Sequence, residues 1–248
     1  MSEYLIFRLY GPMASWGAEA VGGDRHTGMA PTRSAVLGLL GAALGIKRDD
    51  ETQLGLLQAS VRIAVKQTVP STLMRDYHTT QVPTRARGVA HYTRKSELSE
   101  NELNTILSSR DYRCDGLWIV AIRLSADVTF TLAQLKNALL RPKYVLSLGR
   151  KSCPLSLPLA PKVMSADSLF KALDTPFPSV TRSKKEDDFL FGSNGRATYY
   201  WEGEKGDSSD KAILTTHVWD EPLSRARWQF KQREMHQLSV EEGNHVSL

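Results

Sequence analysis

The sequence predicts an α+β fold, because strand-like and helix-like segments alternate along its first 160 or so residues. Apolar residues recur at helical spacing in the segments 31–45 and 131–140. Runs rich in aliphatic and aromatic residues, typical of strands, lie at 4–10, 61–69, 117–124 and 155–161. The order strand, helix, strand, strand, helix, strand is that of a ferredoxin-like (RRM-like) domain, the split β-α-β arrangement.

A glycine-rich loop separates the first strand from the first helix. Gly11-Pro12 ends the strand, because proline lacks the backbone donor that a sheet needs. Within the helix, Gly38, Gly41 and Gly45 each cost about 1 kcal/mol relative to alanine. We expect these glycines to let the helix lie close to a sheet or to another chain. A short turn at Leu54–Leu57 then leads to the second strand.

A long insertion follows the second strand. Residues 70–113 are polar, basic and only weakly periodic, so we expect them to leave the domain rather than to fill its core. The run Leu117–Leu124 is the strongest strand signal in the chain. The helix 131–140 has one apolar side and should end before Pro142.

The character of the sequence changes near residue 165. A short helix at 166–173 precedes a charge run at 184–188 that is typical of a solvated loop. Short strand-like segments lie at 197–201, 213–219 and 228–238. The sequence therefore predicts two units: a ferredoxin-like domain over 1–163 and a small β-rich C-terminal unit over 164–248.

Positive charge is concentrated in three segments. The chain has a net charge of +5, and cations dominate residues 75–95, 141–151 and 225–233. The overall excess is modest, so its placement matters more than its size. If the fold brings these segments together, they form one surface for an anionic partner. The alternative is three independent solvated faces.

Several function classes are excluded on composition and motif. The only cysteines are Cys114 and Cys153, with no CxxC pair, so we expect two free thiols, no zinc site and no other metal. No nucleotide-binding motif is present, and we expect no cofactor. A secretory signal and a long apolar span are both lacking, which favours a cytoplasmic protein with no membrane partner.

The segment Arg141–Pro154 is the most informative stretch. It carries four cationic side chains, one tyrosine and one glycine, and it has no acidic residue. Cations hold phosphates, rings stack on exposed bases, and glycine allows a close approach of the backbone. The segment therefore indicates contact with single-stranded RNA, with a plain solvated loop as the alternative.

Seven segments of the chain resemble the CasD family, a CRISPR-associated subunit of the type I-E Cascade complex. In order they are Gly11–Gly17, Pro31–Ser34 with Leu37–Ile46, Arg75–Thr79, Arg110–Asp115, Arg141–Pro154, Asp220–Pro222, and Gln229-Phe230 with Arg233. The resemblance implies a repeat-associated ferredoxin-like fold with a protruding thumb at about 73–113. It also implies a non-catalytic role in antiviral defence.

The same resemblance implies the partners. We expect the chain to bind the 5′ handle of the CRISPR guide RNA and to cap the backbone filament of CasC subunits beside the large CasA subunit. Target DNA would be met only through the assembled complex.

The candidate RNA-binding residues are cations, rings and small residues in the first loop, the first helix, the insertion and the basic segment. Arg33 and Ser34 open a helix whose unpaired N–H groups attract phosphate, although Thr32 or Ser34 could simply cap it. Trp16 is expected to pack in the core rather than to stack on a base. The full set is Arg25, Arg33, Ser34, Arg75, Tyr77, His78, Arg110, Tyr112, Arg141, Tyr144, Gly149, Arg150 and Lys151.

Two other functions stay open. A metal-independent endoribonuclease that processes the guide-RNA precursor would use His78 as the base, with Tyr77 beside it. Neighbouring strand residues point to opposite faces, which argues against a joint role. A purely structural subunit would touch only protein and would lack salt-sensitive affinity for RNA.

Overall fold

An antiparallel sheet of seven strands forms the centre of the computed structural model, which describes residues 1–18, 20, 22–84, 90–99, 102–125, 129–191, 195–205, 213–224 and 227–241. Its strand order is β7-β1-β6-β3-β8-β10-β9. The strands are β1 Ser2–Tyr10, β2 Met13–Ala14, β3 Val61–Val69, β4 Thr72–Pro83, β5 Leu103–Cys114, β6 Leu117–Leu124, β7 Lys162–Ala166, β8 Arg196–Trp201, β9 Leu214–Ser224 and β10 Gln229–Glu241. The helices are α1 Arg33–Leu44, α2 Glu51–Ser60, α3 Arg94–Glu97, α4 Leu132–Leu140, α5 Leu169–Leu173 and α6 Lys184–Phe191.

The predicted mixture of helices and mainly antiparallel strands is confirmed. β6 pairs antiparallel with both β1 and β3, so β1 and β3 run in the same direction on either side of it. Helices α1 and α2 lie in the connection from β1 to β3, and α4 connects β6 to β7. The register follows the hydrophobic pattern, because Val65 lies opposite Val120 and Ile63 opposite Ile122 on one face of the sheet.

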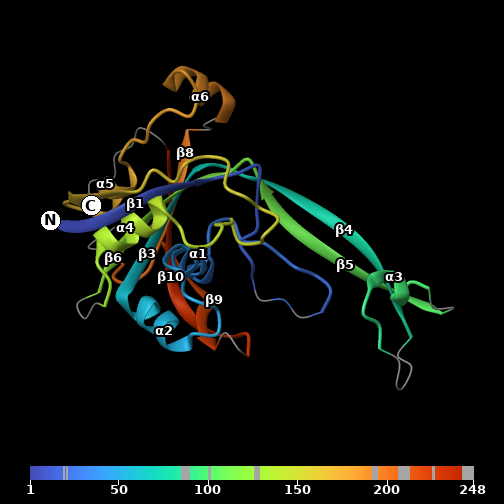
Figure 1. Ribbon diagram of the computed structural model, residues 1–248. Coiled ribbons are helices and arrows are strands. Elements are labelled where there is room, and N and C mark those ends of the chain that lie inside the picture. Colours follow the sequence, from blue (N-terminus) through green and yellow to red (C-terminus); the bar gives the residue numbers. More distant parts are fainter. Residues whose placement is uncertain are drawn as a thin grey trace.

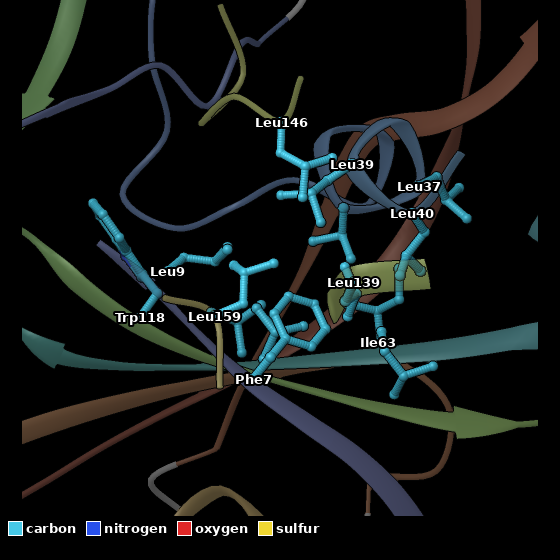
Figure 2. Close-up of a cluster of buried hydrophobic side chains, with 14 of the residues drawn as sticks. Phe7, Leu9, Leu37, Leu39, Leu40, Ile63, Trp118, Leu139, Leu146 and Leu159 are labelled. Atoms are coloured by element: carbon cyan, nitrogen blue, oxygen red, sulfur yellow. The ribbon is translucent and has the colours of Figure 1, made fainter. Parts of the chain in front are cut away.

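The larger core lies between the sheet and helices α1 and α4. Figure 2 shows Leu39 and Leu40 of α1 turned toward Phe7 of β1 and Ile63 of β3, with Leu139 of α4 beside them. Each fully buried side chain of this kind contributes about 1.5–3 kcal/mol relative to exposure. A smaller core covers the opposite face of the sheet, under α5. We call these the α1 face and the α5 face.

The insertion forms a long hairpin. Strands β4 and β5 pair without a register shift from Thr72 opposite Cys114 to Pro83 opposite Leu103. β2 joins the base of β5, and α3 lies near the far end of the hairpin. In Figure 1 the two strands leave the body of the molecule together, which places their outer parts away from the core.

Three sequence expectations need correction. The strand expected at 155–161 lies later in the chain, as β7 at Lys162–Ala166. Pro158 and Pro161 have no N–H to donate to a neighbouring strand, which excludes their segment from the sheet. The expected turn at 54–57 is part of α2, which Asp50 caps by accepting from the backbone N–H of Gln53. The charge run 184–188 opens helix α6 instead of forming a loop.

The C-terminal strands continue the central sheet. β8 pairs with β3, β10 with β8, and β9 with β10 at the edge. Strands from both sides of the expected boundary at residue 163 thus share one sheet, and the division into 1–163 and 164–248 stays a prediction. Among residues with a described position, no helix is long and apolar enough to cross a bilayer.

Candidate nucleic-acid interface

A groove of about 950 Å³ runs along the exposed side of α1. The N-terminal loop and residues 145–150 form one side of it, and β9 with the start of β10 contributes aromatic rings. None of the described residues that line it is acidic. The lining residues are Ser15, Gly17, Ala18, Ala20, Arg25, His26, Thr32, Ser34, Ala35, Gly38, Leu39, Ala42, Arg48, Val145, Ser147, Gly149, Arg150, Trp219, Trp228 and Phe230.

Small side chains of α1 give the groove its room. Ser34, Ala35, Gly38 and Ala42 line it, and a Cβ added at Gly38 would meet no atom within 4 Å. Gly38 therefore makes no close approach to the sheet, and its close approach to another chain stays a prediction. Gly41 is the glycine that lies in the interior, where an added Cβ would contact Leu54 at 3.5 Å.

Buried apolar side chains anchor the basic loop, residues 141–154, to the core. Leu148 and Cys153 are fully buried, and their backbones are joined by a 2.8 Å hydrogen bond from the N–H of Leu148. Gly149 has φ of +88°, and a Cβ there would lie 1.8 Å from the carbonyl oxygen of Ser15. Only glycine fits this close approach, which holds the basic loop against the N-terminal loop.

Arg150 joins three segments at one end of the groove. Its guanidinium donates to the carbonyl of Asp111 at 3.2 Å and to the carbonyl of Arg25 at 3.1 Å. It also lies 4.8 Å over the ring of Tyr112. The backbone of Arg25 in turn pairs with β5 through Ser109 and Asp111. The structure thus brings the predicted residues Arg25, Arg150 and Tyr112 together.

Asp111 neutralises part of the charge at this junction. It is buried and accepts hydrogen bonds from the guanidinium of Arg75 at 2.8 and 3.0 Å. The Nδ1 atom of His26 lies 3.2 Å from the same carboxylate. The hydrogen bond from Arg75 is the main reason that the pKa of Asp111 falls to about 2. Asp111 is therefore ionised at neutral pH and holds the hairpin base to the N-terminal loop.

The aromatic side of the groove was missed from the sequence. Trp219 is 52% exposed and Trp228 is 63% exposed, and Phe230 also lines the groove. The guanidinium of Arg48 lies 3.9 Å over the ring of Trp228. Trp228 also has φ of +53°, which is strained for a residue with a side chain and is often found at functional sites. The available signal was a tryptophan within the basic segment 225–233, but Trp228 was interpreted as part of a strand.

The expectation that the Arg33 side chain contacts RNA needs correction, because this side chain is only 2% exposed. It contacts the carboxylates of Glu202, at 2.5 Å, and Glu221. Its backbone N–H donates to Asp220 at 2.7 Å, and the hydroxyl of Thr32 caps α1 by accepting from the N–H of Ala35. The guanidinium and the backbone N–H of Arg33 therefore have internal anionic partners and are not available to a phosphate.

Arg33 belongs to a buried ion cluster, which consists of Arg33, Glu202, Asp220, Glu221 and Arg233. Arg233 binds Asp220 through two contacts of 2.6 and 2.9 Å, so it too is withdrawn from the basic segment 225–233. Burial raises the pKa of Glu202, against the lowering effect of the two arginines. The cluster ties the start of α1 to β8, β9 and β10.

The remaining predicted residues lie in three places. Arg141, Tyr144 and Lys151 are exposed on the basic loop but do not line the groove. Arg75 and Arg110 are exposed at the hairpin base, whereas Tyr112 is only 6% exposed and cannot offer an open ring to a base. Trp16 is buried edge-on against Trp118 at 5.1 Å, so its expected packing role is confirmed.

His78 and Tyr77 lie further along the hairpin and do not line the groove. His78 contacts the carboxylate of Asp76 at 2.5 Å on the same face of β4, and the exposed ring of Tyr77 belongs to the other face. This geometry gives the histidine one carboxylate partner but no shared site with the tyrosine.

The thiols and acidic groups offer no metal site in the part of the chain that the structure describes. No cluster of three or more His, Cys, Asp or Glu side chains is found there. Cys114 and Cys153 are free thiols, as expected, and burial raises the pKa of both.

Comparison with known proteins agrees with this architecture. A family model described as CRISPR-associated protein (Cas_Cas5) matches residues 4–236. The CRISPR system Cascade subunit CasD of Escherichia coli (strain K12) is 41% identical over 181 residues, which cover 70% of this chain and 76% of that protein.

Two solved structures share the fold. One, titled CRISPR RNA-guided surveillance complex, has a TM-score of 0.63 at 22% identity and covers 96% of this chain and 89% of the other. The second, titled Crystal structure of Cas protein, has a TM-score of 0.57 at 23% identity over 96% of this chain and 95% of the other. The family match over nearly the whole length decides the assignment: the chain belongs to the CRISPR-associated Cas5 family.

Proposed function

We propose that the chain is a non-catalytic subunit of a CRISPR RNA-guided surveillance complex and binds the 5′ handle of the guide RNA in the groove along α1. One observation carries the proposal. Arg25, Arg48 and Arg150 share the groove with Trp219, Trp228 and Phe230, and none of its described lining residues is acidic.

This combination suits a single strand of RNA. Guanidinium groups bind phosphates, and exposed rings stack on bases that are not paired within a duplex. The Arg48–Trp228 pair presents both chemistries at one point. The volume of about 950 Å³ is at the upper end for a ligand site, as expected for a chain segment rather than a small molecule.

The finer features of the fold support the same role. The β1-α1-β3-β6-α4-β7 order is compatible with a ferredoxin-like domain, and the β4–β5 hairpin corresponds to the thumb in our proposal. Arg75, Arg110 and the exposed part of the basic loop would extend the RNA path from the groove toward this hairpin.

The proposed partners follow from the relative named as a Cascade subunit. We propose that the chain caps a backbone of CasC subunits beside CasA, in the cytoplasm, and meets target DNA only within the assembled complex. In this role the chain positions the handle of the guide RNA, and other subunits perform the other functions of the complex.

The test is binding of the full-length chain to a labelled RNA with its natural handle and to a scrambled-handle control, across a salt series. We expect handle-selective binding that weakens with salt, because phosphate contacts release counterions. Replacing Trp228 with alanine should weaken binding about 10-fold, since a stacked base is worth about 1–3 kcal/mol. The matched control is Phe189→Ala, which removes an 86% exposed ring outside the groove.

Equal affinity for both RNAs, or equal loss in the Trp228→Ala and Phe189→Ala proteins, would contradict the groove as the handle site. The nuclease alternative is followed in the same experiment. The close His78–Asp76 pair is the observation that favours it. Metal-free cleavage at one position, abolished by His78→Ala, would replace the binding role by a processing role.

A further inference from the structure

A second hollow lies on the α5 face of the sheet, away from the groove. It has a volume of about 340 Å³ and begins where α5 stops covering the sheet. We call it the arginine pocket, after Arg62 of β3 and Arg123 of β6. The other lining residues are Tyr4, Ile63, Ala64, Ala121, Asp167, Ser168, Leu169, Phe170, Trp201, Glu202, Glu204 and Lys205.

Arg62 and Arg123 lie directly opposite each other in the register of β3 and β6. Arg62 alternates with Val61 and Ile63, which belong to the α1-face core, so its side chain is on the α5 face. Directly paired residues have Cβ atoms about 4.5–5.5 Å apart, and like charges in this position are unfavourable. The pair therefore costs folding free energy unless another group compensates it.

No carboxylate of the described chain is bound to either arginine. Both arginines are exposed, and neither guanidinium has an ion pair or hydrogen bond within the described ranges. Asp167 is paired with Lys171 at 3.0 Å, and the carboxylate of Glu202 is held in the buried ion cluster. Glu204 and Lys205 add one exposed charge of each sign to the lining, which leaves the two arginines without a bound counter-ion on strands of the central sheet.

The chemistry of the pair favours a phosphate group. A carboxylate has only two oxygens, which lie in one plane, so a single bidentate guanidinium fork already engages both of them. A phosphate carries more oxygens in a tetrahedral arrangement, so it can accept from two neighbouring forks at the same time. Two arginines held side by side therefore match a phosphate better than an acidic side chain.

The rest of the pocket has room for the organic part of such a ligand. The small side chains of Ala64 and Ala121 leave space above the sheet. Tyr4, Phe170 and Trp201 provide aromatic surface around this space. Ligand sites usually combine an apolar lining with a few convergent polar groups, in volumes of about 300–1,000 Å³.

We propose that Arg62 and Arg123 form a phosphate-binding site, separate from the groove, that takes the phosphate of a nucleotide or of a nucleic-acid strand. The proposal predicts which ligands bind to the arginine pocket. A nucleoside without its phosphate should not bind there, and each arginine should contribute about 10-fold or more in affinity, as expected for hydrogen bonds to a charged group.

The experiment is calorimetric titration of the full-length chain at low salt with adenosine 5′-monophosphate, adenosine, inorganic phosphate, a trinucleotide and a glutamate-rich peptide. The variants are Arg62→Gln and Arg123→Gln. The matched control is Arg196→Gln, which changes an exposed arginine on β8. Thermal unfolding is measured for each variant.

We expect the monophosphate to bind, adenosine to fail, and both pocket variants to lose about 10-fold in affinity while Arg196→Gln keeps wild-type affinity. A trinucleotide that binds tighter than the monophosphate identifies a strand as the source, and equal affinity identifies a free nucleotide. Neither pocket variant should melt below the wild type, since each removes a repulsion.

Three results would overturn the proposal. They are no pocket-dependent binding of any phosphate ligand, preferential binding of the glutamate-rich peptide at the two arginines, and a fall in melting temperature in both pocket variants. Loss of handle-RNA binding in Trp228→Ala alone concerns the groove, so the two sites can fail independently.

Discussion

Replacing Asp111 with asparagine tests how the hairpin is joined to the body of the protein. The carboxylate accepts two hydrogen bonds from Arg75 and lies 3.2 Å from Nδ1 of His26. Asparagine keeps the size of the side chain but removes its charge. The change therefore isolates the electrostatic part of the junction.

The pKa of Asp111 gives the magnitude. It falls from 3.8 to about 2, mainly through the hydrogen bond from Arg75, and one pKa unit corresponds to about 1.4 kcal/mol. The Arg75 side chain is 56% exposed, so screening by water reduces the full value. We expect Asp111→Asn to lower the free energy of unfolding by about 1–2 kcal/mol at pH 7.

The dependence on pH has a definite sign. The folded-state pKa is lower than the unfolded-state pKa, so the ionised carboxylate stabilises the fold above about pH 4. This contribution is lost as the pH falls through about 4 to 2. The difference between the wild type and Asp111→Asn should therefore be constant near neutrality and shrink toward zero near pH 2.

Urea unfolding at a series of pH values measures this difference. Asp49→Asn is the matched control, because Asp49 is exposed on the loop before α2 and its side chain has no ion pair within the described residues. A difference for Asp111→Asn that persists unchanged to pH 2 would refute the electrostatic origin. Equal stability of wild type and variant at pH 7 would refute the junction itself.

Three further predictions concern the buried parts of the site. Arg33→Met leaves the carboxylate of Glu221 without a cation and that of Glu202 with Arg233 alone, so the free energy of unfolding should fall by about 3–5 kcal/mol in a urea titration; a neutral effect would contradict the ion cluster. Gly149→Ala places a Cβ 1.8 Å from a carbonyl oxygen at positive φ and should cost at least about 1–3 kcal/mol, whereas Gly17→Ala, with no atom within 4 Å of the new Cβ, should be almost neutral. Cys153, fully buried, should react with a thiol reagent much more slowly than the partly exposed Cys114, and equal rates would show that the basic loop opens readily.

Much of the central sheet and the helices α1 and α4 could be predicted, because their signals are local. The strands Val61–Val69 and Leu117–Leu124 have the predicted bounds, since alternation and turn residues mark both ends. The helix predicted at 131–140 begins at Leu132 after a capping box of Thr131 and Gln134. The prediction of a strand at 155–161 failed because prolines interrupt its apolar residues. The hydrophobic pattern does not show which residues have an N–H to donate to a neighbouring strand.

The candidate site could be predicted only where its residues act within one segment. The basic loop was found because its cations, ring and glycine are neighbours in sequence. Arg33 was assigned to RNA because its counter-ion Glu202 lies 169 residues away, and a local charge count cannot reveal that partner. Trp219 and Trp228 were missed for the related reason that exposure is a tertiary property: a tryptophan in a strand pattern is more often buried.

The correction for Arg33 changes its role without removing it from the site. One wall of the groove is α1, and the aromatic wall belongs to β9 and β10. Asp220 of β9 binds the backbone N–H of Arg33 and the guanidinium of Arg233 of β10, so the ion cluster fastens both walls at one end. Buried pairs of this kind contribute little net stability, but they define one arrangement because every alternative leaves a charge unpaired. Arg33 thus sets the separation of the groove walls, and the strength of RNA binding should depend on it through that separation and not through a phosphate contact.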